Sequence, residues 1–177
     1  MNTEIFKQAG AVSLQNNQVK NNFNEIFYAR KQALSKIFVG NDRNTNHFKE
    51  IATIKGVNFL DDSQSTKPNM TWYSLTGINQ SVIWIAGGNM LQQSLYSLQQ
   101  VAKEKVRILI NIGNSDLIRP FEGIVKTIIS VENIYQAVEI AYNYASAGEA
   151  VLYSPACGNN NETKQNSRDY FLAINAI

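Results

Sequence analysis

Short apolar runs alternate with amphipathic stretches along most of the chain. An unbroken apolar run over residues 81–86 predicts a buried strand of a parallel sheet, and residues 106–112, 126–130 and 150–153 predict three more strands. Apolar positions at helical spacing predict helices between and after these strands. They are Leu91, Leu95, Leu98, Val101 and Ala102, then Ile134, Ala137, Val138, Ala141 and Ala145, and finally Tyr170, Ala173, Ile174 and Ile177.

Three shorter elements complete the pattern. Residues 48–54 and 57–60 predict two strands joined by a hairpin turn at Lys55-Gly56. A helix is expected over residues 69–75, after a proline, and a short helix around residues 116–122, although Pro120 fits poorly inside it. The predicted fold is therefore α/β: a Rossmann-like, mostly parallel sheet of about six strands with helices on both faces.

The first part of the chain follows a different pattern. After a polar start, apolar residues fall on one face of a predicted N-terminal helix over residues 22–38. A glycine and a polar run over residues 41–46 then interrupt it. We therefore predict an N-terminal arm and helix over residues 1–45 and an α/β domain over residues 46–177. The apolar stripe of the helix raises the possibility of a dimerising scaffold.

Composition narrows the function classes. The chain has 177 residues, an apolar fraction of 44% and a net charge of +2 without any basic run, so nucleic acid is not an expected partner. The single cysteine excludes an intrachain disulfide and fits a reducing compartment. The sequence shows neither a secretory signal nor an apolar segment near the ~20 residues of a membrane span. We expect a cytoplasmic protein with no membrane partner.

Several standard chemistries have no motif in the chain. Neither G-x-x-x-x-G-K-[ST] nor G-x-G-x-x-G occurs, so neither glycine-rich phosphate-binding device is present. One His and one Cys, far apart, do not make a zinc site. A Ser/His/Asp triad would have to use His47, the only histidine, and the chain has no G-x-S-x-G nucleophile elbow to go with it. We therefore assign no catalytic residue and no metal ligand, and expect no cofactor for this chain alone.

Two polar clusters follow predicted strands, where open α/β sheets hold their ligands. Residues 56–67 read GVNFLDDSQSTK, and residues 154–161 read SPACGNNN. Asp62 has two interpretations: it hydrogen-bonds a ligand or a neighbouring loop, or it caps the following turn or helix. Cys157 is expected to be a packed small side chain. Glycines end two predicted strands, at Gly87-Gly88 and at Gly113. With no side chain, they allow either a ligand or a neighbouring element to approach the backbone.

These motifs, in their order and spacing, resemble the C-terminal domain of the Mur ligases, and most nearly the D-glutamate-adding type. The resemblance runs from about His47 to the C-terminus. It rests on the His47 position, on residues 56–67, on the strand that ends in Gly87-Gly88, and on residues 153–160, which read YSPACGNN. In a complete ligase of this family, the central domain binds ATP and Mg²⁺. The C-terminal domain closes over it while an acyl phosphate forms and is attacked by the amine of D-glutamate.

The resemblance implies roles for particular residues. Substrate-binding positions would be Asp62, Ser63, Thr66, Asn159 and Asn160. His47 and Gly88 would contact the nucleotide.

The chain departs from the family where cations are expected. Phe48, Gln64 and Leu91 stand where family members carry an arginine and two lysines, and Lys67 is either a substitute or a solvated loop residue. We therefore expect a stand-alone, non-catalytic binding or regulatory module in a cell-wall context. The alternative is the substrate- and nucleotide-binding portion of an active ATP-dependent D-glutamate-adding ligase of peptidoglycan synthesis. Expected partners are another protein chain, a second copy, or a small anionic ligand.

Overall fold

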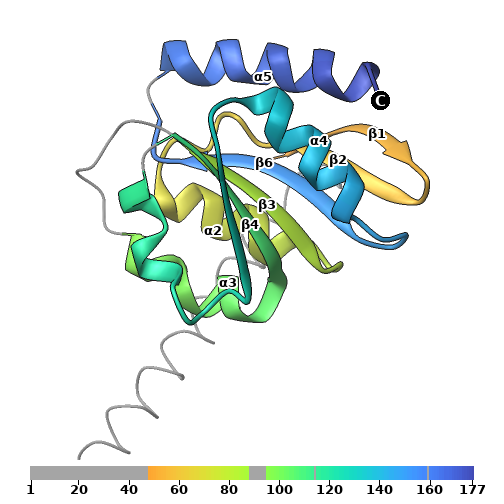
Figure 1. Ribbon diagram of the computed structural model, residues 1–177. Coiled ribbons are helices and arrows are strands. Elements are labelled where there is room, and N and C mark those ends of the chain that lie inside the picture. The colour runs from red at the N-terminus through yellow and green to blue at the C-terminus, as the bar shows by residue number, and fades with distance from the viewer. Residues whose placement is uncertain (1–47, 88–94, 114, 159) are drawn as a thin grey trace, which may run out of the picture. The chain divides into compact units, whose positions relative to one another are not determined.

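A computed structural model of the chain describes residues 48–87, 95–113, 115–158 and 160–177 (Figure 1). All of them belong to one compact unit, Asn46–Ile177. The helix predicted over residues 22–38 lies outside the described residues, as does Leu91.

The described strands form a single sheet in the order β1-β2-β6-β3-β4-β5. Only β1 runs antiparallel to its neighbour; the other pairs are parallel. The predicted mostly parallel sheet is confirmed. The strands are β1 (Lys49–Ile54), β2 (Val57–Asp61), β3 (Val82–Gly87), β4 (Val106–Ile112), β5 (Thr127–Val131) and β6 (Ala150–Ala156).

The hairpin between β1 and β2 has the predicted turn. Lys55 and Gly56 both have left-handed backbones, with φ of 50° and 78°. Two left-handed residues are typical of the tight I′ turn, whose twist matches that of the strands it joins. A Cβ on Gly56 would lie 3.1 Å from the Cβ of Ala147, so close packing also favours glycine here.

The helices connect the strands much as predicted. They are α2 (Pro68–Gly77), α3 (Gln99–Lys105), α4 (Ile134–Tyr144) and α5 (Asn160–Asn175), with 3-10 turns η1 (Leu95–Leu98), η2 (Ser115–Leu117) and η3 (Arg119–Phe121). The single short helix expected around residues 116–122 is instead two 3-10 turns. Pro120 lies in the first turn of η3, where a missing N–H costs no internal hydrogen bond.

Two further expectations need correction. Strand β6 continues past Tyr153 to Ala156, because this segment goes on pairing with β3, where Gly87 lies opposite Ala156. Ile177, expected on the buried face of the closing helix, is 42% exposed because α5 ends at Asn175.

Helices cover both faces of the sheet, as predicted: α4 and α5 lie over one face, and α2 and α3 over the other (Figure 1). Successive residues of a strand point to opposite faces. Accordingly, Trp84 of β3 belongs to a core beneath α2 and α3, the Trp84 cluster, whereas Ile83 and Ile85 belong to a core beneath α4 and α5, the Tyr153 cluster.

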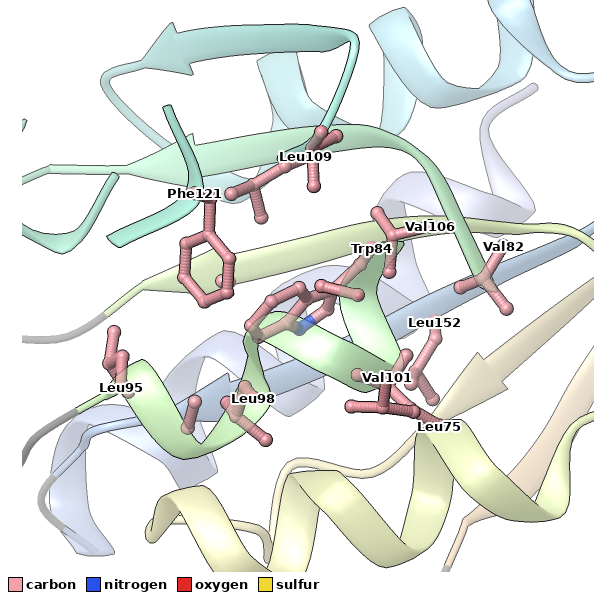
Figure 2. Packing of buried hydrophobic residues seen from close by; sticks show 14 of the residues in the cluster. Leu75, Val82, Trp84, Leu95, Leu98, Val101, Val106, Leu109, Phe121 and Leu152 are labelled. Carbon is pink, nitrogen blue, oxygen red and sulfur yellow. The ribbon is translucent and has the colours of Figure 1, made fainter. Parts of the chain in front are cut away.

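The Trp84 cluster joins the core to the polar end of the sheet. The Trp84 ring meets Phe121 edge-on, with centroids 5.3 Å apart and planes at 88°, in the packing that Figure 2 shows. The buried indole N–H donates to the backbone oxygen of Ser154 at 2.8 Å. A buried indole needs such an acceptor. The bond therefore fixes the end of β6 relative to β3.

Candidate functional site

The two polar clusters of the sequence meet in the sheet. Strands β2 and β6 pair in parallel, with Asp61 opposite Tyr153, although β6 is the last strand of the chain. Their carboxyl ends therefore lie side by side at one edge of the sheet, the usual place for a ligand in an open α/β fold. This juxtaposition brings the Asp62 and Ser154 segments together.

Asp62 lies at the centre of a buried hydrogen-bond network. It is only 1% exposed. Its Oδ1 accepts from the Ser65 hydroxyl at 2.8 Å, and its Oδ2 accepts from the Ser154 hydroxyl at 2.7 Å. Its N–H donates to the oxygen of Tyr153 at 2.8 Å. A buried carboxylate with such donors is satisfied within the protein and joins the loop after β2 to β6.

The network continues to α2 through Thr71. The Thr71 and Ser154 hydroxyl oxygens are 2.8 Å apart, and both residues are fully buried. Ser154 has one proton, which it donates to the Asp62 carboxylate, so Thr71 donates to Ser154. The hydrogen bonds thus run from Thr71 of α2 to Ser154 of β6 and from there to Asp62. They join α2, β6 and the loop after β2.

The loop after β2 is also fixed through its backbone. The N–H of Ala156 donates to the oxygen of Ser65 at 3.0 Å. Ala156 has a left-handed backbone, with φ of 63°, and is fully buried. This conformation costs a residue with a side chain roughly 1–2 kcal/mol. The surrounding hydrogen bonds hold it in place.

Asp61 connects the same edge to α5. Its Oδ1 accepts from the N–H of Ser63 at 2.9 Å, and its Oδ2 accepts from the hydroxyl of Ser167 at 2.6 Å. Beneath it, Tyr170 of α5 donates to the oxygen of Val151 at 3.3 Å. Burial, and then the nearby charge of Asp61, raise the pKa of Tyr170 well above its ordinary value.

The other predicted site residues fall into two groups. Ser63 is buried and Thr66 is half-buried. Both lie in the loop after β2, the same loop that contains Asp62. His47, Gly88 and Asn159 lie outside the described residues, and Asn160 is described only as the first residue of α5.

Two of the positions where the resemblance implies cations are described. Phe48 is half-buried and packs against the Trp84 cluster. Gln64 is exposed in the loop after β2, and Lys67, which precedes α2, is exposed as well. Within the described ranges, Arg119 follows β4 and pairs with Asp116 at 3.0 Å on the surface.

Sequence reasoning missed several members of the network. Ser65, Thr71 and Ser167 were not predicted as site residues, and Ser154 was noted only as the first residue of the second polar cluster. Ser65 follows Asp62 by three residues, a spacing typical of local side-chain hydrogen bonds in turns. Nothing in the sequence signals Thr71 or Ser167, because their partners are far away in the chain.

The strand-exit glycines are explained by packing and turns. A Cβ on Gly87 would lie 2.8 Å from the Cβ and the oxygen of Ile112 on β4. Gly113 has φ of 84° and turns the chain after β4. Buried Cys157 is a packed side chain, as predicted.

Two features are absent from the part of the chain that the structure describes. No group of three or more His, Cys, Asp or Glu side chains in these ranges is placed to hold a metal ion. Among the same residues, no helix is long and apolar enough to cross a membrane.

Sequence comparison links the chain to one kind of enzyme. The UDP-N-acetylmuramoylalanine–D-glutamate ligase of Porphyromonas gingivalis is 36% identical over 118 residues, which are 65% of this chain and 26% of that enzyme. The ligase of the same name from Christiangramia forsetii is 28% identical over 135 residues, 75% of this chain and 30% of that enzyme. No family model matches the chain. The chain thus spans less than a third of the length of these relatives.

Solved structures share the fold. A murein peptide ligase from Psychrobacter arcticus superposes with a TM-score of 0.53 at 13% identity, over 75% of this chain and 30% of that one. The UDP-N-acetylmuramate-alanine ligase of Thermotoga maritima gives 0.50 at 13% identity, over 74% of this chain and 30% of that one. At such identities the likeness concerns the fold alone. Together, the sequence similarity to the D-glutamate ligases and the shared α/β fold support a Mur ligase domain in this chain.

Proposed function

We propose that residues 46–177 form a non-catalytic binding or regulatory module of the Mur ligase type that acts in peptidoglycan synthesis. The main observation behind this proposal is the residue at position 48, Phe48. It stands where the resemblance implies an arginine, and its half-buried ring packs against the Trp84 cluster. An apolar ring in a core cannot neutralise a phosphate or a carboxylate, so the position has exchanged a charge for packing.

Gln64 supports the same conclusion. It stands where the resemblance implies a lysine, and it is exposed at the edge where β2 and β6 end. Loss of one group that stabilises negative charge in a transition state typically costs ~10²–10³ in rate. Such losses are not additive when residues act as a unit. Two of them at one edge nevertheless favour binding over catalysis.

The buried network explains what the domain retains. Asp62, Ser65, Ser154 and Thr71 satisfy one another and hold the edge of the sheet in shape. The proposed ligand-binding positions Asp62, Ser63, Thr66, Asn159 and Asn160 belong to this edge by resemblance. Asp62 would support this edge from within, since Asp62, Ser65 and Ser154 are all buried. A binding module needs this shape but not the cations.

Ligand binding tests the proposal directly. Thermal unfolding of the 177-residue chain should be measured with ADP, with D-glutamate and with a muramoyl-peptide nucleotide. A ligand present at about 100 times its dissociation constant stabilises a protein by ~2.7 kcal/mol. We expect no shift with ADP or D-glutamate, and any shift to come from the muramoyl-peptide nucleotide. Clear shifts with both ADP and D-glutamate would contradict the non-catalytic proposal.

The alternative is that the chain is the substrate- and nucleotide-binding portion of an active D-glutamate-adding ligase, which would use ATP and Mg²⁺. Identity of 36% to such an enzyme over 118 residues favours it. His47 and Gly88 would then contact the nucleotide. Adding an ATP-binding partner domain should, in that case, produce amide formation with D-glutamate.

A chimera separates the two proposals. The matching segment of the Porphyromonas gingivalis ligase would be replaced by residues 46–177 of this chain. We expect ligase activity to fall by about 10² or more, because Phe48 and Gln64 lack the cations that the resemblance implies at these positions. The chimera carrying Phe48→Arg and Gln64→Lys should recover part of the loss, while Lys103→Gln, at an exposed side chain of α3, serves as a matched control. Full activity of the unmodified chimera would support the active-ligase alternative.

A further inference from the structure

The two edges of the described sheet differ in regularity. Edge strand β1 pairs with β2 through a register shift between Glu50 and Ala52. Edge strand β5 pairs with β4 without any shift, residue by residue from Thr127 to Val131. Irregular pairing and bulges protect an edge against further strands, whereas a regular edge offers a template for pairing. Strand β5 is therefore the edge suited to accept another strand.

The backbone direction of β5 identifies which groups point outward. The oxygen of Val131 accepts from the N–H of Gly113, which follows β4, at 3.1 Å. In a parallel pair the N–H and C=O of one residue face the same neighbour, and successive residues alternate sides. Val131, Ile129 and Thr127 therefore face β4. The backbone groups of Ile128 and Ser130 face away from it.

The sequence around β5 is self-complementary in charge. Exposed Lys126 precedes the strand and exposed Glu132 follows it. An antiparallel pair centred on Ile129 places Lys126 of one copy opposite Glu132 of the other, and the same pair recurs at the other end by symmetry. Opposite charges directly across two strands stabilise their pairing, and like charges destabilise it.

The same register satisfies the outward backbone groups. With Ile129 opposite Ile129 of the second copy, Ile128 lies opposite Ser130 of the second copy. Residues that face each other in this way exchange both backbone hydrogen bonds in an antiparallel ladder. Four of the five β5 residues are β-branched, which suits strand pairing. The half-buried Ile129 side chains would cover each other.

We propose that β5 is a homodimer interface, in which two copies of this chain pair antiparallel through residues 126–132 and join their sheets. The occupant is a second copy because the Lys126–Glu132 charge pattern complements itself. The N–H of Glu132 already donates to the Gln136 side chain at 3.0 Å, so the ladder ends there. This inference is independent of the proposed function.

The interface is short, so the dimer is expected to be weak and concentration-dependent. Sedimentation velocity of the full chain, up to about 1 mM protein, should show reversible dimerisation. Lys126→Glu and Glu132→Lys, each alone, place like charges opposite each other twice per dimer and should weaken association about tenfold. A chain that stays monomeric throughout this range overturns the proposal.

Charge reversal provides the decisive control. The double variant Lys126→Glu with Glu132→Lys restores opposite charges and should restore wild-type association. Mixing the two single variants should also give a heterodimer, since each contributes the charge that the other lacks. If the single variants dimerise as strongly as the wild type, or if they do not associate with each other when mixed, the dimer uses another surface.

Ser130→Pro tests the backbone ladder. Proline removes an N–H that faces away from β4, so the sheet itself should survive while the pairing is lost. Circular dichroism and thermal unfolding confirm that the variant folds. If Ser130→Pro does not fold, the charge series still decides the question. A folded Ser130→Pro variant that dimerises like the wild type overturns the proposal.

Discussion

At the scale of single residues, Asp62 is the most consequential side chain of the site. It accepts hydrogen bonds from Ser65 and Ser154 and is almost fully buried. Its sequence position suggested a hydrogen bond to a ligand or a neighbouring loop, or a cap of the following turn or helix. The structure places it within the protein, as the acceptor that holds the loop after β2 against β6.

We predict that Asp62→Ala destabilises the chain by about 2–4 kcal/mol. The substitution leaves two buried serine hydroxyls without their acceptor, and hydrogen bonds to a charged group are stronger than average. Urea unfolding at neutral pH measures the change. Asp116→Ala is the matched control, because its exposed pair with Arg119 should contribute no more than about 1 kcal/mol. Equal losses for the two variants would contradict the buried-network account.

Tyr170 should make stability depend on alkaline pH. Burial raises its pKa in the folded chain well above the ordinary value of about 10. Its contribution is therefore fully present below about pH 10. It is lost as the pH rises towards the folded pKa, because the unfolded state releases the proton first. The slope is at most about 1.4 kcal/mol per pH unit for one proton.

Tyr170→Phe should flatten this alkaline loss and cost about 1 kcal/mol at neutral pH, where the bond to Val151 disappears. Chemical denaturation at a series of pH values measures both effects. Tyr96→Phe is the control, since Tyr96 is 63% exposed, and it should keep the wild-type slope. An unchanged slope in Tyr170→Phe would rule out this assignment.

At the scale of elements, the contact between β3 and β4 depends on one glycine. A Cβ on Gly87 would lie 2.8 Å from both the Cβ and the backbone oxygen of Ile112, and a backbone atom cannot move aside cheaply. We predict that Gly87→Ala destabilises the chain by about 3 kcal/mol, at the upper end for overpacking. It should also reduce amide-exchange protection at the ends of β3 and β4.

Gly148→Ala serves as the control for this prediction. A Cβ there meets no atom within 4 Å, and only its φ of +88° opposes the change. The cost should be about 1–2 kcal/mol, without any loss of protection in β3 or β4. Protection lost equally in both variants would show that crowding at Ile112 is not the cause.

At the scale of the whole molecule, the buried clusters that the structure describes lie within residues 46–177. The Trp84 and Tyr153 clusters contain buried residues from the sheet and from helices on both faces. We predict that a chain of residues 46–177 folds by itself and unfolds in one cooperative transition. Urea denaturation of this shortened chain tests the predicted boundary. A shortened chain without a cooperative transition would contradict it.

The sequence by itself determined the elements and their layering. An unbroken apolar run such as residues 81–86 marks a strand buried on both faces, and β3 covers Val82–Gly87 in the structure with every residue buried. The Lys55-Gly56 turn and the α4 stripe are local signals too, since one residue's backbone freedom or a helical period fixes them. Motif order also indicated the Mur ligase resemblance.

Only the tertiary structure decided how the site is built. The order β2-β6-β3 places Ser154 beside Asp62, although the two are far apart in the chain. Thr71 and Ser167 join the same edge from α2 and α5, and no local pattern marks them. Burial and the hydroxyl donors Ser65 and Ser154 make Asp62 an acceptor that joins the loop after β2 to β6. Periodicity reports how each segment folds, whereas hydrogen-bond partners across a sheet depend on strand order, which periodicity does not encode.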